Sequence, residues 1–558
     1  MDGEVSVVIA GGGLVGLSTA LFLAGQGVRA LLVEKHDGPS PQLRGRGLNL
    51  RSMEVLRAAG VEAALRAAPP SVLRDLPEIA RAEDLSGPQS FHAVRTAPES
   101  VGRLSPTVPL MIDQNAVEPV LREQARRLGA ELRFSTRLES FEQDGAGVEV
   151  RLRDLARGTW RTVRADYLVA ADGHRSGIRD ALGIGTSGVG SIAHYVNIPF
   201  LADLSGPLRG RRLAVCYLDR PRPNTMLTRL DHPQRWVLMV PYRPGAGERA
   251  EDFGVERCVE LIRAATGVAD LDPELLGLAA SAGAGCPAPV QTWELCSRTA
   301  DRYRAGRVLL TGDAAHVMAP AGGLGGNTGI QDAHNLAWKL AAVLRGAADE
   351  RLLDTYEQER RPVALAACEL SVRQQLSRRS GEPVRSSGPA LQPLAAVLGH
   401  RYRSAAVVAE EHAGEPPAPS LDLTGEPGSR APHHPLVRGG VELSTLDLYR
   451  DAFVLLCGVE GGRWAAAGRR LAPRLGVRVH RIGEELLDGP GGFAAAHGIT
   501  DSGAVLVRPD GFVCWRAPDD LVTSPHRTLN TVLARVLGLP DGPALPYQRG
   551  ISGLSGAR

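Results

Sequence analysis

A glycine turn near the start of the chain has the residue types and spacing that bind a diphosphate. It follows the apolar run Val7–Ala10 and contains Gly11, Gly13 and Gly16. Gly11 permits a tight turn, Gly13 lets the backbone approach a pyrophosphate, and Gly16 lets a helix pack closely on its strand. Glu34 follows the next apolar run and can accept hydrogen bonds from ribose hydroxyls. The pattern predicts a dinucleotide site, although an ordinary strand–turn–helix unit would share it.

Two distant segments decide between these interpretations. In the first, an apolar run ends at Asp172, and a basic segment with Arg175 follows the Asp-Gly turn. In the second, another apolar run leads to Asp313 and then to a glycine loop from Pro320 to Asn327. A strand that delivers an aspartate to a glycine loop can position a cofactor next to exposed backbone amides.

These three segments, in this order, resemble the FAD-dependent aromatic hydroxylases, the single-component flavoprotein monooxygenases related to para-hydroxybenzoate hydroxylase. The resemblance also covers residues 44–49 and 114–118, and therefore most of the first 400 residues. It implies an extended FAD whose diphosphate lies at the first glycine turn and whose ring lies beside the loop at 320–327. The cofactor-binding residues that it implies are Gly11, Gly13, Leu14, Val15, Gly16, Glu34, Lys35, Arg46, Gln114, Leu138, Asp172, Asp313, Pro320, Gly323, Gly325, Gly326 and Asn327.

The loop at 320–327 is the expected site of the oxygen chemistry. Backbone groups at Pro320, Gly322 and Gly323 are expected to position the flavin and to stabilise negative charge on it. A helix that begins near Asn327 would add its positive dipole end. Ala321 and Leu324 stand where the family has other residues, and we expect them to make the pocket larger or more apolar. No side chain is assigned as an acid or base, and His316 is expected to be structural.

Some of these assignments have alternatives. Arg46 could be a surface arginine, Gln114 could simply start a helix, and Asp172 could form an Asx turn instead of contacting a ligand. NADPH or NADH would bind transiently on the FAD domain, because only one strand–glycine–helix unit is present. The arginines near 44–51 favour NADPH slightly.

The alternation of apolar patterns predicts an α/β fold with three units. A Rossmann-like FAD-binding domain is expected at residues 1–75, 105–183 and 285–395, with an inserted antiparallel β substrate domain at 76–104 and 184–284. Helices are expected over 117–125 and about 330–375, and residues 356–362 resemble a helix end in the family. Within the inserted sheet, about half of six candidates should face the substrate: Tyr217, Arg229, Trp236, Met239, Tyr242 and Trp293.

Residues 396–558 are expected to form a third unit after proline- and glycine-rich segments. A strand at 452–456, a helix at 464–475, a strand at 477–480 and a hairpin across Pro509-Asp510-Gly511 resemble the thioredoxin-like domain of large aromatic hydroxylases. Cys457 follows the first strand and has no nearby partner cysteine, so we expect a buried structural thiol and a domain without a dithiol.

Composition limits the other classes of function. The 558 residues carry 64 basic and 62 acidic side chains, a formal net charge of +2 that predicts no nucleic-acid binding. The seven cysteines have no metal-ligand spacing, so no metal is expected. We see no signal peptide and no apolar run long enough to span a membrane. A cytoplasmic monomer or homodimer is the expected form.

The resemblance implies an enzyme of the polyketide-tailoring type. It would consume NAD(P)H and O2 and would hydroxylate a bulky, electron-rich aromatic compound through a flavin C4a-hydroperoxide. Two alternatives stay open at this point. The same flavin species could insert oxygen into a polycyclic ketone in a Baeyer–Villiger reaction, or the chain could be a redox-silent protein that binds flavin or substrate.

Overall fold

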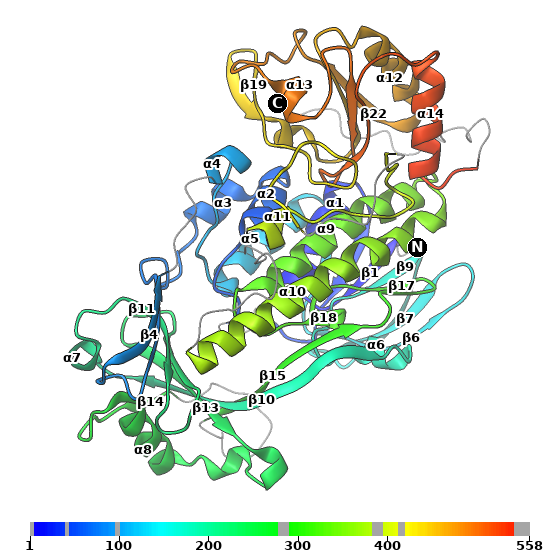
Figure 1. The fold of residues 1–558 in the computed structure, drawn as a ribbon. Helices are drawn as coiled ribbons and strands as arrows, with labels where there is room; N and C mark the ends of the chain where they lie inside the picture. Colours follow the sequence, from blue (N-terminus) through cyan, green and yellow to red (C-terminus); the bar gives the residue numbers. More distant parts are fainter. Residues whose placement is uncertain are drawn as a thin grey trace.

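The computed structural model describes residues 5–38, 44–94, 101–276, 290–381, 394–410 and 419–540. It contains three units: a central α/β domain, a large β-sheet domain at one end, and a smaller α/β domain at the other (Figure 1). The long helix α10, which runs from Asp354 to Ser380, extends from the central domain toward the large sheet. The predicted α/β class is confirmed.

The central domain contains a six-stranded sheet. Strands β1, β2, β5, β9 and β17 are parallel, and the short β16 pairs with β17 in the antiparallel direction. Their order across the sheet is β16-β17-β9-β1-β2-β5. The strands are β1 (Val7–Ala10), β2 (Ala30–Val33), β5 (Glu131–Arg133), β9 (Tyr167–Ala170), β16 (Arg304–Ala305) and β17 (Val308–Leu310).

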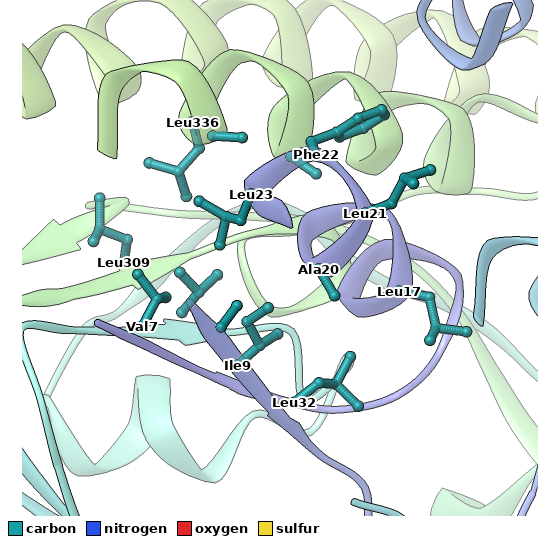
Figure 2. Packing of buried hydrophobic residues seen from close by; sticks show 14 of the residues in the cluster. Val7, Ile9, Leu17, Ala20, Leu21, Phe22, Leu23, Leu32, Leu309 and Leu336 are labelled. Atoms are coloured by element: carbon teal, nitrogen blue, oxygen red, sulfur yellow. The ribbon is translucent and has the colours of Figure 1, made fainter. Parts of the chain in front are cut away.

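Helix α1 (Leu14–Gly25) packs between this sheet and helix α9 (Leu324–Leu344). Figure 2 shows Ala20 of α1 above Ile9 of β1, with Leu23 directed toward Leu336 of α9. These side chains are buried in a core that also contains Val148 and Val150 of β7, so elements cover the parallel sheet on both faces. The packing fixes the start of α1 relative to the start of α9. Further helices of this domain are α2 (Leu50–Ala58), α3 (Glu62–Ala67), α5 (Gln114–Arg127) and α6 (Gly177–Ala181).

The second unit contains a nine-stranded sheet. Its main path is β18-β15-β10-β13-β12-β11-β3-β4, and β14 pairs with β10. Helix α8 (Val255–Thr266) belongs to this unit, and a separate three-stranded sheet, β6-β7-β8, adjoins the central domain. The strands of both sheets are β3 (Glu78–Ala82), β4 (Gln89–Val94), β6 (Thr136–Gln143), β7 (Val148–Asp154), β8 (Trp160–Ala165), β10 (Thr186–Leu201), β11 (Leu213–Leu218), β12 (Thr225–Arg229), β13 (Arg235–Tyr242), β14 (Glu274–Leu275), β15 (Gln291–Ala300) and β18 (His316–Val317).

The extent of this sheet differs from the predicted domain boundaries. Strand β15 pairs with β10 and β18 pairs with β15, so the sheet includes residues that were expected in the FAD-binding domain after position 285. On the other side, α4 (Val101–Leu104) lies outside the sheet, and Val101 packs against Leu50 and Leu398. Alternating polarity predicts a strand but does not tell which sheet it joins, so the boundary after position 285 could not be placed from the sequence.

Helix α10 passes through Pro362 and continues to Ser380, so the expectation of a helix end near residues 356–362 is wrong. Proline removes one backbone hydrogen bond from a helix interior. Here the residues that follow it, Val363, Ala364 and Ala367, are buried against the rest of the molecule. Tertiary packing therefore outweighs the tendency of proline to end the helix.

The third unit has a four-stranded sheet in the order β22-β21-β23-β24. Strands β21 and β22 are parallel and joined through α12, whereas β23 and β24 form the predicted hairpin. This is the thioredoxin-like arrangement expected from the sequence. A hairpin of β19 and β20 precedes it. Its elements are β19 (Pro435–Arg438), β20 (Val441–Ser444), β21 (Phe453–Cys457), α12 (Gly462–Leu475), β22 (Val477–Arg481), α13 (Phe493–Ala496), β23 (Ala504–Val507), β24 (Val513–Ala517) and α14 (Pro525–Val536).

A buried charged cluster joins the third unit to the central domain. Glu359 of α10 accepts hydrogen bonds from Lys339 Nζ of α9 (2.8 Å) and from Arg508 Nη1 beside the hairpin turn (2.6 Å). Arg508 also donates to Asp510 Oδ2 at 2.5 Å. Burial lowers the pKa of Lys339 to about 8, against the opposing effect of Glu359. We call Glu359, Lys339, Arg508 and Asp510 the junction cluster.

The six described cysteines are all buried and free; Cys286 lies outside the described residues. Burial raises the pKa of the Cys457 thiol to about 12, which makes it a poor nucleophile. Among the helices that the structure describes, none has the length and apolar character needed to cross a membrane.

Candidate functional site

The first glycine turn requires glycine at positions where a side chain would collide with backbone. Gly11 has φ +107°, and a Cβ atom added to it would lie 2.2 Å from the carbonyl oxygen of Ala171. A Cβ atom added to Gly16 would lie 1.9 Å from the oxygen of Gly11. Strand β1, strand β9 and helix α1 therefore approach one another as closely as a dinucleotide turn requires.

Gly13 differs from its neighbours because the space beside it is open. An added Cβ atom would meet only Glu118 Oε1, at 3.8 Å. Gly13 is the N-cap of α1 and provides no side-chain hydrogen bond to the first turn. The N-cap residue thus provides no cap of its own to the amides of Leu14, Val15 and Gly16, and the Leu14 amide faces the carboxyl group of Glu118. A helix N-terminus of this kind favours an anion. These residues fit a diphosphate.

Glu34 supports the same turn at the end of β2. Its Oε2 accepts the Gly12 N–H at 2.7 Å, and its Oε1 accepts the His36 N–H at 2.9 Å. Lys35, the residue after Glu34, is exposed. Leu138 of β6 is partly buried and packs against the core of the central domain. Glu34 is therefore fixed next to the turn, in the position where a ribose would follow the diphosphate.

Gln114 and Arg46 lie on the other side of the turn and make internal contacts. Gln114 Oε1 accepts the Gly45 N–H at 3.2 Å, and its Nε2 donates to Glu118 Oε1 at 2.7 Å. Arg46 Nε donates to Asp113 Oδ1 at 2.6 Å, while its Nη1 donates to the carbonyl of Arg229 at 2.7 Å. Arg46 thus joins the central domain to the large sheet. Contacts of Arg46 and Gln114 with FAD stay predictions.

Sequence reasoning did not single out Glu118. Its side chain is 3% exposed and lies between Gln114 and the first turn of α1. Burial raises its pKa, against the hydrogen bond from Gln114, the charge of Arg44 and the amide of Leu14, whereas the charge of Glu34 adds to the rise. A buried acid beside an anion-binding turn is unusual, because ionised carboxylates repel phosphates. Only its position four residues after Gln114 could have indicated it.

Asp172 lies between β9 and α6, next to the first glycine turn. Its Oδ2 accepts the N–H of Ile178, in the first turn of α6, at 3.2 Å. This bond reaches six residues along the chain, unlike an Asx turn, and a contact of Asp172 with a ligand stays a prediction. Its Oδ1 is buried without a hydrogen-bond partner, and burial raises the pKa of this carboxyl group. The Asp172 Cα atom lies 3.2 Å from the Cβ position of Gly11, so the unpartnered oxygen is near the glycine turn.

Asp313 lies in the short helix Gly312–Ala314. Gly312 of this helix packs against Val15 of α1.

The second glycine segment is arranged differently from the prediction. Helix α9 begins at Leu324 and not near Asn327, so Gly325, Gly326 and Asn327 lie in its first turn and the loop ends at Gly323. Glycine has low helix propensity, which hid this start. An added Cβ atom at Gly326 would lie 3.1 Å from Leu14, so the first turns of α9 and α1 are in contact.

The N-terminus of α9 is also uncapped. Its N-cap, Gly323, has φ +63°, makes no side-chain cap, and has open space at its Cβ position. Gly322 has φ +89° and lies against Gln374 of α10, while Pro320 is exposed. Two uncapped helix N-termini therefore lie side by side, and both can face negative charge on one extended ligand.

Asn327 holds this arrangement together. Its Oδ1 accepts the Asn49 N–H at 2.8 Å, and its Nδ2 donates to the carbonyls of Gly47 (3.1 Å) and Gly323 (2.8 Å). The side chain is thus committed to backbone groups on both sides. Leu324 packs against Ala367 and Leu370 of α10, and its expected effect on the size or polarity of the pocket stays a prediction.

His316 is held by charged neighbours. Its Nε2 lies 2.6 Å from Asp332 Oδ2, and Asp332 Oδ1 accepts a hydrogen bond from Arg360 Nε at 2.7 Å. All three side chains are buried. This geometry supports the structural role expected for His316.

The large sheet separates the six substrate-site candidates onto its two faces. Tyr217, Met239 and Trp293 lie on the face that packs against Ala319, just before the glycine loop. Trp236 and Tyr242 lie on the opposite face, with α8, and the guanidinium group of Arg229 lies over the Trp236 ring on that face. The face toward the loop also carries Tyr195, which stacks on Trp293 with ring centroids 4.9 Å apart. An aromatic cluster, in which Trp293 is partly exposed and Tyr195 is buried, therefore packs against Ala319 ahead of α9.

Comparisons with known proteins agree with this geometry. Residues 4–371 match the family model described as FAD binding domain, and residues 424–540 match the model described as aromatic-ring hydroxylase, C-terminal. The chain is 45% identical to a putative polyketide hydroxylase of Streptomyces halstedii, over 96% of this chain and 98% of that protein. It is 42% identical to the tetracenomycin A2 monooxygenase-dioxygenase of Streptomyces glaucescens, over 97% and 99% of the two chains. Aklavinone-11 hydroxylase, solved in a ternary complex with FAD and aklavinone, superposes with a TM-score of 0.85 at 40% identity and covers 96% of this chain and 100% of that chain.

Proposed function

Because the chain belongs to the FAD-dependent aromatic-ring hydroxylases, we propose that its substrate is a fused-ring aromatic polyketide. The relatives named above act on tetracenomycin A2 and aklavinone, and both are similar to this chain over nearly its full length. The enzyme is a flavin-dependent monooxygenase that uses NAD(P)H and O2. The observation that carries the proposal is the contact between two uncapped helix N-termini beside an aromatic sheet face.

Different residues of this chain bind different parts of FAD and the substrate. The first turn of α1 binds the diphosphate, and Glu34 binds the adjoining ribose. Backbone groups at Pro320, Gly322 and Gly323 and the first turn of α9 hold the flavin edge. When bound, the flavin supplies the activation of O2. Asn327 fixes the loop, and the stacked rings of Tyr195 and Trp293 align the substrate and keep water away.

Oxygen transfer to an aromatic ring gives a specific test. Purified holoenzyme is mixed with NADPH or NADH and with alizarin, a dihydroxyanthraquinone, and oxygen uptake and products are measured. We expect faster uptake with NADPH, and a product that gains one oxygen atom on a ring carbon. A lactone product would replace the proposal by Baeyer–Villiger insertion. Failure of NAD(P)H to bleach the flavin without oxygen would favour a redox-silent protein.

A further inference from the structure

One face of helix α10 runs from the glycine loop to the aromatic sheet face. Near its middle, Cys368 Sγ lies 3.5 Å from Thr299 Oγ1 and donates to the Val317 carbonyl at 3.6 Å. Near its end, Arg379 Nη1 donates to Tyr195 OH at 3.3 Å. The two positions are 11 residues apart, about three helical turns, and therefore lie on the same face. This face of α10 covers the region between the loop and the sheet.

Gln375 occupies the middle of that face. It is seven residues after Cys368 and four before Arg379, which places it between the two contacts. Its side chain is 0% exposed, and neither Nε2 nor Oε1 has a hydrogen-bond partner. Its neighbour Gln374 reaches the loop, with Oε1 2.7 Å from the Cβ position of Gly322. A buried amide with both ends unpaired is rare in native proteins and indicates a missing partner.

The polar groups near Gln375 are already committed to one another. Tyr195 OH accepts from Arg379 and donates to the Asn224 carbonyl at 3.3 Å. Trp293 Nε1 donates to Asn197 Oδ1 at 2.7 Å. Burial raises the pKa of Tyr195, against the charge of Arg379. Tyr195 therefore stays a neutral phenol, and Gln375 is the group of this set with both a donor and an acceptor to offer.

We propose that Gln375 is a specificity-determining residue that hydrogen-bonds the oxygen substituents of a hydroxylated quinone or phenol stacked beside Tyr195 and Trp293. This inference rests on the proposed function and names the substrate chemistry. A carboxamide matches such a ring system because it accepts from a phenolic hydroxyl and donates to a quinone carbonyl. An unsubstituted polycycle would leave the amide unpaired, so the site discriminates by the cost of an unmade hydrogen bond.

The test compares Gln375→Leu with the wild-type holoenzyme. Dissociation constants for alizarin and for anthracene, a polycycle of the same ring number without oxygen substituents, are measured from changes in flavin absorbance, without NADPH. We expect the substitution to weaken alizarin binding about tenfold or more and to leave anthracene binding unchanged. KM for alizarin should rise together with the dissociation constant. The melting temperature of the variant should equal or exceed that of wild type, because the substitution removes an unpaired buried amide.

Controls separate specificity from structure. Ser371→Ala removes a buried hydroxyl one turn earlier on α10, where it is bonded only to the Cys368 carbonyl, and should change neither constant. Gln375→Met provides an unbranched replacement if leucine disturbs the helix. Equal binding of alizarin by wild type and both Gln375 variants would overturn the inference and leave the proposed function intact. If the wild-type holoenzyme binds neither alizarin nor anthracene, the proposed substrate class fails together with the inference.

Discussion

The cofactor site and the junction cluster differ in how many hydrogen-bond partners their polar groups have. At the cofactor site the N-caps Gly13 and Gly323 provide no side-chain hydrogen bond, and Asp172 Oδ1 has no partner. At the junction cluster Glu359 accepts hydrogen bonds from Lys339, Arg508, Asn335 and Ser404.

The difference shows what each region is for. Unmade hydrogen bonds cost stability, and at the cofactor site they leave polar groups free to bind a ligand. Complete pairing of buried charges fixes one geometry between two domains. The junction cluster therefore holds the third unit in a defined position against α9 and α10, whereas the glycine turns and Gln375 stay available.

The largest effect is expected at the junction cluster. Glu359→Gln removes the charge between Lys339 and Arg508 and leaves two buried cations with Asp510 alone. We expect a loss of about 3–5 kcal/mol in the free energy of unfolding, measured by urea denaturation. Asp231→Asn, in the exposed ion pair with Arg235, is the control and should cost less than about 1 kcal/mol. Equal losses would show that the junction cluster contributes no more than a surface pair.

A smaller effect is expected at the glycine turn. Gly16→Ala places a Cβ atom 1.9 Å from a backbone oxygen and should cost about 1–3 kcal/mol and most of the FAD affinity. Gly25→Ala, at the other end of α1, meets nothing within 4 Å and should be neutral or stabilising. Flavin content after purification and thermal unfolding measure both variants. Retention of FAD by Gly16→Ala would contradict the close approach of α1 to its strand.

The buried carboxyl group of Glu118 should make both the stability of the fold and the binding of FAD depend on pH. Its raised pKa means that the folded chain binds more protons than the unfolded chain between the usual carboxyl pKa and the folded value, so stability falls as pH rises through that window. A diphosphate disfavours the ionised acid further, so FAD binding should take up a proton and weaken as pH rises. Glu118→Gln should flatten this profile, measured by flavin fluorescence, with an effect of about tenfold. Glu123→Gln, on the same helix but exposed, should keep the wild-type profile. A pH-dependent variant at position 118 would exclude this role.

The smallest effect is expected at Cys457. The thiol is buried and its pKa is raised to about 12, so Cys457→Ala should leave NADPH-driven turnover unchanged. The cost in stability should be about 1 kcal/mol, from the lost packing. Loss of turnover with retained FAD would assign a redox role to the third unit.

Much of this architecture could be predicted because it depends on local pattern. The first turn, the hairpin at Pro509-Asp510-Gly511 and the strand before Asp313 combine short apolar runs with residues that only turns favour. The start of α9 could not be placed, because glycines at 325 and 326 disfavour a helix that packing against α1 stabilises.

The remaining features depend on contacts between distant residues. Arg508 and Glu359 are separated by 149 positions, and Arg51 reaches the carbonyl of Asp510 across 459. A periodic pattern in the sequence does not predict which distant residues form such pairs. The same holds for Gln375, which reads as an ordinary helical glutamine until the fold shows that both ends of its amide are buried and unpaired.

Helix α10 carries Glu359 near one end and Arg379 near the other, about 30 Å apart along its axis. Hybrid enzymes built by exchanging the last unit between relatives must therefore choose their crossover point with care. A joint placed after residue 394 sets an imported hairpin arginine against the recipient's own glutamate. Any misfit there would be transmitted along the helix to the sheet face that is proposed to bind the substrate.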